Sequence, residues 1–321
     1  MPPSLIEKDV HNTLAYFAYN QYPLTAFEVY KWQYCPERVY SYQEIDKVLK
    51  GSDWLLNRVG HFEGMYGLGN NLEVEQQVAA RKRRFLDAVK KQKKACKVVQ
   101  YISRLPSVRG VAICNSLAYH FTREKSDIDL FIISRRGTIW LARFFSTLIV
   151  KLLGMRPKED NKKDTFCLSF FVDERYLDIE NSMMNSNDIY YPYWVSNLIP
   201  VYNPDNLYEK FLEANKWHKK YLPNTYPNQF SKEIKANNFS KFFGILANFI
   251  FNPPIIKRWL YNWYRSFQIK IIDKNLKALI NIDTRVIVNE RMLKFYSNDN
   301  RELFARRWKE RVRKILNKYK Q

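Results

Sequence analysis

Ser126-Asp127-Ile128-Asp129-Leu130-Phe131-Ile132-Ile133 combines two carboxylates with a run of apolar residues. Side chains alternate across a strand, so Asp127 and Asp129 are expected on one face, and Ile128 and Leu130 on the other. Two carboxylates held close together suit a hard divalent cation such as Mg²⁺ or Mn²⁺, which keeps further positions for water and phosphate. The pattern therefore predicts a place where a metal ion and a triphosphate meet.

The residues before this run predict the rest of such a site. Residues 108–114 read as a buried strand that stops at Asn115 and Ser116. A short helix over 117–121 follows, with Ser116 as its N-cap, and its free N–H groups would face a phosphate. Arg123 adds positive charge nearby. We expect four residues around the carboxylates to bind the nucleotide: Asn115, Ser116, Lys125 and Ser126.

A strand, a Gly-Ser turn, a short helix and Ser-Asp-x-Asp on the next strand form the pattern of the DNA polymerase β-like nucleotidyltransferase superfamily, which this chain resembles. It also resembles uncharacterised bacterial nucleotidyltransferase domain-containing proteins, through segments 134–143, 166–171, 211–224 and 292–301. The resemblance implies an α/β (α+β) nucleotidyltransferase fold with a mixed sheet. It also implies transfer of a nucleoside monophosphate from an NTP to an acceptor hydroxyl, with Asp127 and Asp129 as catalytic residues and metal ligands.

The sequence departs from the superfamily pattern at two points. Asn115 stands where the usual turn has glycine, although Asn tolerates unusual φ values better than most residues. Members with polymerase-like chemistry place a third carboxylate on the neighbouring strand, where one face here presents Cys167 and Ser169. Acidic residues occur only at the ends of that strand, as Asp164 and Asp173, and Asp299 is a further candidate contributor.

These departures leave two classes of function open. The first is a metal-dependent nucleotidyltransferase that uses an NTP with Mg²⁺ or Mn²⁺, and whose acceptor is RNA, a protein or a small molecule. The alternative is a catalytically degenerate protein of the same fold that acts as a nucleic-acid-binding or regulatory module. A third hypothesis is a toxin–antitoxin component that modifies a partner protein.

Charge is the second large feature of the chain. Lys and Arg number 53 against 32 Asp and Glu, which gives a net charge of +21 and favours a polyanionic partner such as RNA or DNA. A dense basic block lies on a strongly helical stretch. It is either a solvated helix face or a surface that contacts the phosphates of RNA or DNA. The candidate nucleic-acid-binding residues are Arg81, Lys82, Arg83, Arg84, Lys90, Lys91 and Lys94.

The pattern divides the chain into four parts. Residues 1–75 read as a winged-helix-like module of three helices followed by two strands, at 54–59 and 62–68, joined through Gly60 and His61. Residues 76–99 form a basic connecting helix. The nucleotidyltransferase core spans 100–183, and residues 184–321 are predicted to be a C-terminal helical region.

The cysteines, the N-terminus and the apolar runs indicate the cellular compartment. Four scattered cysteines form no zinc-binding pattern, and the N-terminus lacks the apolar core of a signal peptide, so we expect a reduced, cytoplasmic protein. The apolar run at 242–251 ends at Asn252-Pro253-Pro254 and is too short to cross a bilayer. We therefore expect no integral membrane span.

Overall fold

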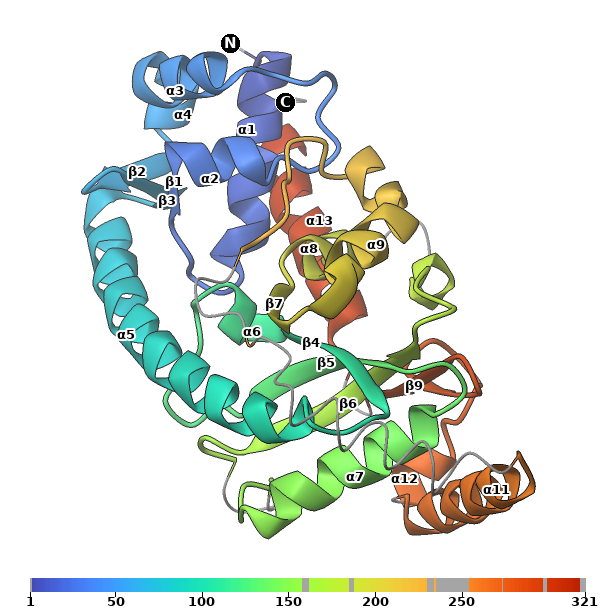
Figure 1. The fold of residues 1–321 in the computed structure, drawn as a ribbon. Coiled ribbons are helices and arrows are strands. Elements are labelled where there is room, and N and C mark those ends of the chain that lie inside the picture. The colour runs from blue at the N-terminus through green and yellow to red at the C-terminus, as the bar shows by residue number, and fades with distance from the viewer. Residues whose placement is uncertain are drawn as a thin grey trace.

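The computed structural model describes residues 2–157, 162–184, 188–229, 234, 254–272, 274–296 and 299–317. It is a mixed α+β fold with two sheets joined by one long helix (Figure 1). The apolar run predicted at 242–251 lies outside the described residues. Within the described ranges, no helix combines the length and hydrophobicity that a membrane crossing requires.

The N-terminal part contains four helices around a small antiparallel sheet of order β1-β3-β2. Three helices begin with capping boxes, in which a Ser or Thr side chain accepts from the N3 backbone and a Glu side chain accepts from the cap. These caps set the starts of helices whose apolar faces meet in one core. The elements are α1 (Leu5–Ala18), β1 (Leu24–Thr25), α2 (Ala26–Lys31), α3 (Tyr42–Gly51), α4 (Asp53–Leu56), β2 (Val59–Phe62) and β3 (Met65–Leu68).

The hairpin of this part differs from the prediction. The first half of the segment at 54–59 belongs to the one-turn helix α4, because Ser52 accepts a hydrogen bond from the Leu55 N–H and caps it. The chain then turns at Glu63 and Gly64, whose φ values of 46° and 73° fit a two-residue hairpin turn. The predicted joint at Gly60 and His61 lies instead within β2, where Gly60 pairs with Gly67.

Helix α5 (Asn71–Ile102) connects the two sheets and includes residues 76–99, the predicted connecting helix (Figure 1). Its N-terminal half packs on β2 and β3, and its C-terminal half packs on the large sheet and α7. Asn70 caps its start by accepting from the Glu73 N–H at 2.9 Å. This 32-residue helix therefore fixes where the N-terminal part lies relative to the large sheet.

The large sheet has six strands in the order β7-β4-β5-β6-β9-β8. The central pair β5 and β6 is parallel, and the other pairs are antiparallel. Its strands are β4 (Val108–Ile113), β5 (Ile128–Ser134), β6 (Phe166–Asp173), β7 (Ile199–Tyr202), β8 (Val286–Val288) and β9 (Met292–Phe295). Three of these strands come from the region after residue 183 that the sequence predicted as helical, so the sheet extends beyond the predicted core.

Each face of this sheet buries a separate cluster. Leu130 and Ile132 point toward α5 and α7 (Ile139–Leu152), whereas Phe131 and Ile133 point toward α8 (Tyr190–Ser196) and α9 (Leu207–Ala214). The predicted alternation along β5 is therefore confirmed. Because Asp129 and Phe131 are two residues apart, Asp129 lies on the face that α8 and α9 cover.

Strand β6 contains one extra residue relative to β5. Asp129 is in register with Cys167, but Phe131 is in register with Phe170, so three steps along β6 match two along β5. This bulge puts Cys167 and Phe170 on the same face, although simple alternation would separate them. A polar group and an aromatic surface therefore adjoin on one side of the sheet.

Helix α13 (Arg301–Asn317) brings the end of the described chain back to its beginning, where it packs against α1 (Figure 1). The Trp308 indole donates to the Asn12 carbonyl at 3.0 Å. Helices α11 (Pro254–Ile271) and α12 (Lys274–Lys277) lie at the far end of the molecule, with α11 against α7. The short 3-10 turns are η1 (Glu180–Ser182), η2 (Pro204–Asn206) and η3 (Lys216–Lys220).

Candidate active site

Asp127, Asp129 and Cys167 converge at the start of the parallel strand pair. One ligand atom from each lies within 4.8 Å of the others. Asp127 immediately precedes β5, and Cys167 is the β6 partner of Asp129. The structure thus brings together the two carboxylates that the sequence singled out. In the described part of the chain the third member of the group is a thiol.

The surroundings of these groups change the pKa values of the Asp129 carboxyl and the Cys167 thiol. Burial raises the pKa of the Asp129 carboxyl to about 7, and the neighbouring charge of Asp127 adds to this effect. Hydrogen bonds from the side chains of Asn115 and Cys167 act in the opposite direction. Burial also raises the pKa of the Cys167 thiol, and so does Asp129, so the thiol is neutral at pH 7. Two carboxylates that repel one another in a buried place favour a bound cation.

The donor set suits one divalent cation held through oxygen. Carboxylate oxygens are ligands that Mg²⁺ and Mn²⁺ accept, whereas a neutral thiol is a poor ligand for either. Asp127 and Asp129 would therefore hold the ion. The Cys167 thiol, which hydrogen-bonds Asp129, also lies 2.7 Å from the Ser169 hydroxyl.

Acidic residues that were candidates for a third ligand are occupied by cations. Lys91 Nζ binds Asp164 at 3.0 Å, and Lys94 also pairs with it. Asp173 is fully buried and accepts from the Arg175 guanidinium at 2.8 Å and from the Gly137 N–H. Their pKa values are lowered because hydrogen bonds from these cations outweigh burial.

Asn115 adopts the left-handed conformation that the replaced glycine would favour, with φ of 56°. Its side chain adds an anchor that glycine lacks. Oδ1 accepts from the Trp194 indole at 2.9 Å and from the Tyr190 hydroxyl at 3.3 Å. Asn115 thereby ties the turn after β4 to α8, while its side chain also reaches Asp129.

The other predicted nucleotide ligands surround this turn. Helix α6 begins at Asn115 and ends at Ala118, so Ser116 lies inside its single turn and is not the N-cap; the cap is Cys114, without a side-chain bond. A helix this short has a weak dipole, because few peptide units are aligned. Ser116 is exposed and lines a cavity beside the carboxylates, as does Ser126. Lys125 is exposed outside that lining.

The cavity has a volume of about 480 Å³ and is walled mainly by three parts of the chain, to which Arg84 of α5 and Phe170 of β6 add. Tyr16, Phe17 and Tyr22 come from the N-terminal part, and Asn115 and Ser116 come from the turn after β4. The third wall combines α8 and β9 with the first turn of α13. The N-terminal part is therefore a wall of the candidate site.

Two arginines give one part of this wall a positive charge. The Arg84 guanidinium lies 4.0 Å from the centre of the Phe121 ring, and its pKa is lowered first by burial and then by Arg123. Arg123 is exposed, so this part of the cavity opens to solvent. Within the described residues neither arginine forms an ion pair with a carboxylate. A bound anion would offset the positive charge of Arg84 and Arg123.

The basic face of α5 is partly used inside the molecule. Arg81 pairs with Glu28 at 2.5 Å, and Lys91, only 2 % exposed, donates to the carbonyls of Glu124 and Ser126. Both bind neighbouring segments to the helix. Lys82 and Lys94 form surface pairs with Glu63 and Asp164. Of the seven predicted residues, those left without an ion pair in the described chain are Arg83, Arg84 and Lys90.

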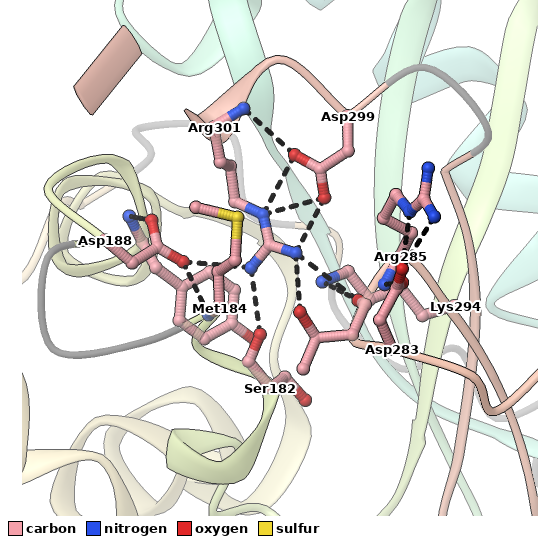
Figure 2. Close-up of polar contacts among 10 residues, drawn as sticks. Ser182, Met184, Asp188, Asp283, Arg285, Lys294, Asp299 and Arg301 are labelled. Carbon is pink, nitrogen blue, oxygen red and sulfur yellow. Dashed lines mark hydrogen bonds and ion pairs between the residues drawn. The ribbon is translucent and has the colours of Figure 1, made fainter. Parts of the chain in front are cut away.

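Two residues of the cavity wall were missed as site residues. Lys294 of β9 is 2 % exposed, and its one sequence signal is a lone charge in the apolar run Met292-Leu293-Lys294-Phe295. Arg301 is buried between Asp299, at 2.6 Å, and Asp188, at 2.9 Å (Figure 2). It also donates to the Ser182 carbonyl, and so fixes the start of α13 against the loop before α8. No family model, curated protein or solved structure matches this chain.

Proposed function

We propose that this protein is a metal-dependent nucleotidyltransferase with the nucleotidyltransferase fold, which moves a nucleoside monophosphate from an NTP to an acceptor hydroxyl. The observation that carries the proposal is the convergence of Asp127 and Asp129 next to Asn115, which lines a cavity together with Ser116 and two arginines that form no ion pair within the described residues. The mixed sheet, with Asp129 on its central strand pair and Asp127 immediately before that strand, supports the same fold. The N-terminal helices and hairpin support a winged-helix-like module.

The residues of the chain have separate tasks in this proposal. Asp127 and Asp129 would hold the divalent ion, which when bound would offset phosphate charge and lower the pKa of the acceptor hydroxyl. Ser116 offers a hydroxyl donor to the triphosphate. Arg84 and Arg123 attract the polyphosphate to the open side of the cavity. Positioning and charge neutralisation make up most of the catalysis of phosphoryl transfer, so few residues suffice.

Asn115 acts through Asp129. Its anchor on Trp194 fixes the turn, and its side-chain hydrogen bond favours the ionised carboxylate that a metal ligand must be. Aromatic side chains on the cavity wall exclude water from the bound substrate. This arrangement gives the turn a role that a glycine could not perform.

Transfer of α-³²P label from each NTP, with Mg²⁺ or Mn²⁺, to total RNA, lysate protein and the protein itself tests the proposal. Wild type should label one acceptor class, and Asp127→Asn with Asp129→Asn should abolish labelling. Asp46→Asn, in a surface pair with Lys50, is the matched control and should label normally. Absence of label with every NTP, metal and acceptor would overturn the enzymatic proposal.

A second function is favoured by Cys167 in the position of a carboxylate ligand and by the exposed Arg83 and Lys90 on α5. It is a non-catalytic module that binds RNA or DNA through phosphate contacts. Fluorescence anisotropy should then show binding that weakens steeply with salt and survives loss of both aspartates. Arg83→Glu with Lys90→Glu should weaken it, and binding that is unaffected by this pair would exclude the α5 surface.

A further inference from the structure

Lys294 lies on the same face of the large sheet as the carboxylates. It pairs directly with Phe170 of β6, and Phe170 shares its face with Phe131 and hence with Asp129. The lysine lines the same cavity as Asn115 and Ser116. The side chain is therefore a buried amine in the wall of the candidate active site.

The surroundings of this amine leave part of its hydrogen-bonding capacity unused. Nζ donates to the Thr284 carbonyl at 2.8 Å, and within the described residues it makes no second hydrogen bond. The rings of Phe170, Tyr191 and Tyr296 lie 5.3–5.9 Å from Nζ. An ammonium carries three donors, and a buried donor without an acceptor is unfavourable.

Neighbouring carboxylates do not supply the missing acceptor. Arg301 holds Asp188 and Asp299, and Arg285 holds Asp283 at 2.7 Å (Figure 2). Burial lowers the pKa of Lys294 to about 7, and Arg301 contributes in the same direction against the weaker effect of the aspartates. The amine is thus a donor that a ligand oxygen would satisfy.

Aromatic rings beside Lys294 stack on one another and border the cavity. Trp194 stacks on Phe170 at 5.1 Å and on Tyr191 at 5.8 Å, with interplanar angles of 24° and 7°. Tyr296 meets Phe170 edge-on, with ring centroids 6.4 Å apart, and lines the same cavity. The aromatic residues that line the cavity would contact a flat aromatic ligand through apolar ring atoms.

The cavity also has a separate cationic part. Arg84 contacts Phe121 and the Asn20 carbonyl, and neither of these residues contacts Lys294. An anion and a planar ring would therefore be recognised at different places on the wall. The volume of about 480 Å³ lies within the range of small-molecule sites. A nucleoside phosphate has both chemical features.

We propose that the cavity binds a nucleobase that carries a carbonyl oxygen, with Lys294 as the donor to that oxygen. The proposal rests on the proposed function, since it names the class of nucleotide for the same site. A lysine donates and does not accept when it is charged, so it selects an oxo group over the amino group of adenine. Guanine, hypoxanthine and uracil offer such an oxygen.

The experiment uses inosine 5′-monophosphate and adenosine 5′-monophosphate, which differ in the 6-oxo and 6-amino groups and cannot donate a nucleotidyl group. Calorimetric titration of wild type at about pH 6, where the amine is mostly protonated, should give about tenfold tighter binding of the inosine nucleotide, the factor expected for one charged hydrogen bond. Lys294→Met should reduce this ratio to about one by weakening only the inosine nucleotide. Circular dichroism would verify that the variant is folded.

Lys31 provides a matched control. It is also buried, its pKa is lowered to about 8 by burial, and its Nζ donates to Asn228 at 3.2 Å outside the cavity lining. Lys31→Met should retain the wild-type ratio. Equal affinities in wild type, a preference for the adenosine nucleotide, no binding of either, or an unchanged ratio in Lys294→Met would overturn the proposal.

The two proposals fail in distinguishable ways. Selective binding that depends on Lys294, with no transfer of label, would refute the enzyme and leave an oxo-base pocket. Transfer of label without a preference between ITP and ATP would refute the role of Lys294 and leave the enzyme.

Discussion

The Trp194 indole donates a hydrogen bond to Asn115 Oδ1 at 2.9 Å, which ties α8 to the turn that ends β4. The two residues lie 79 positions apart in the sequence. This bond makes Asn115 both a backbone residue in the left-handed region and a tertiary anchor. The two roles can be separated by substitution.

Asn115→Gly should destabilise the protein by about 1–2 kcal/mol, because the buried Trp194 donor loses its acceptor while the backbone keeps its conformation. Asn115→Ala should cost about 1 kcal/mol more, since a Cβ is unfavourable at φ of 56°. Urea unfolding of both variants measures the difference. Equal losses would mean that the turn carries no strain for alanine.

Mg²⁺ or Mn²⁺ should raise the melting temperature of wild type by about 2–4 °C relative to EDTA, because the ion binds only the folded carboxylate pair. Asp129→Asn should melt higher than wild type in EDTA, since it removes a buried charge next to Asp127. It should also lose the response to metal. Cys167→Ala should keep the response; if it does not, the thiol is a metal ligand after all.

Lys294→Met should change stability in a pH-dependent way. Folding lowers the pKa of the amine from 10.5 to about 7, so in that interval the unfolded chain binds more protons. The penalty of burying Lys294 is complete below about pH 7 and declines as pH rises toward 10.5. The variant should therefore gain more stability over wild type at about pH 6.5 than at about pH 9.5, by up to about 3 kcal/mol. A constant difference across this range would contradict the prediction.

His11 should make the fold sensitive to acid. Burial lowers its pKa to about 4, and Arg58 adds to the effect, so folding favours the neutral ring. The unfolded state binds more protons between about pH 6.5 and 4, and stability should fall as pH decreases through this window, by up to about 3 kcal/mol. His11→Gln should flatten the profile, measured by urea unfolding. His61→Gln, at an exposed site, should leave the slope unchanged.

Substitution of the adjacent residues Lys90 and Lys91 of α5 should change the free energy of unfolding by different amounts. Lys91→Met should destabilise the protein by about 2 kcal/mol, because it removes a buried ion pair and leaves the Glu124 and Ser126 carbonyls without their donor. Lys90→Met, at an exposed position, should change stability by less than about 0.5 kcal/mol. Thermal unfolding compares the two. A similar loss in both would show that the internal contacts of Lys91 are not stabilising.

Local patterns predicted much of the fold. The alternation along β5 placed Asp129 correctly, because it depends on neighbours within a few residues. The hairpin was misplaced because Ser52 caps a helix turn that an apolar run had suggested as a strand. The strands after residue 183 are short, and β7 and β9 join the sheet through β4 and β6, far away in the sequence.

In the candidate site, too, some features follow from local geometry and others depend on segments far away in the sequence. Asp127 and Asp129 are two residues apart, so their proximity follows from strand geometry alone. The anchoring of Asn115 by α8 depends on the packing of a distant helix on the sheet. Lys294 is buried because β9 lies between β6 and β8, a placement that no local pattern specifies.

The extra residue in β6 has a consequence for how the site could change during evolution. Each β6 side chain after the extra residue points to the face opposite to the one that it would occupy in a strand without the bulge. Loss of a single residue there would turn Phe170 and Val172 toward α5 and α7, and Phe171 into the cavity. The number of residues in β6, and not only their identity, therefore keeps Cys167 and Phe170 on the same face of the sheet.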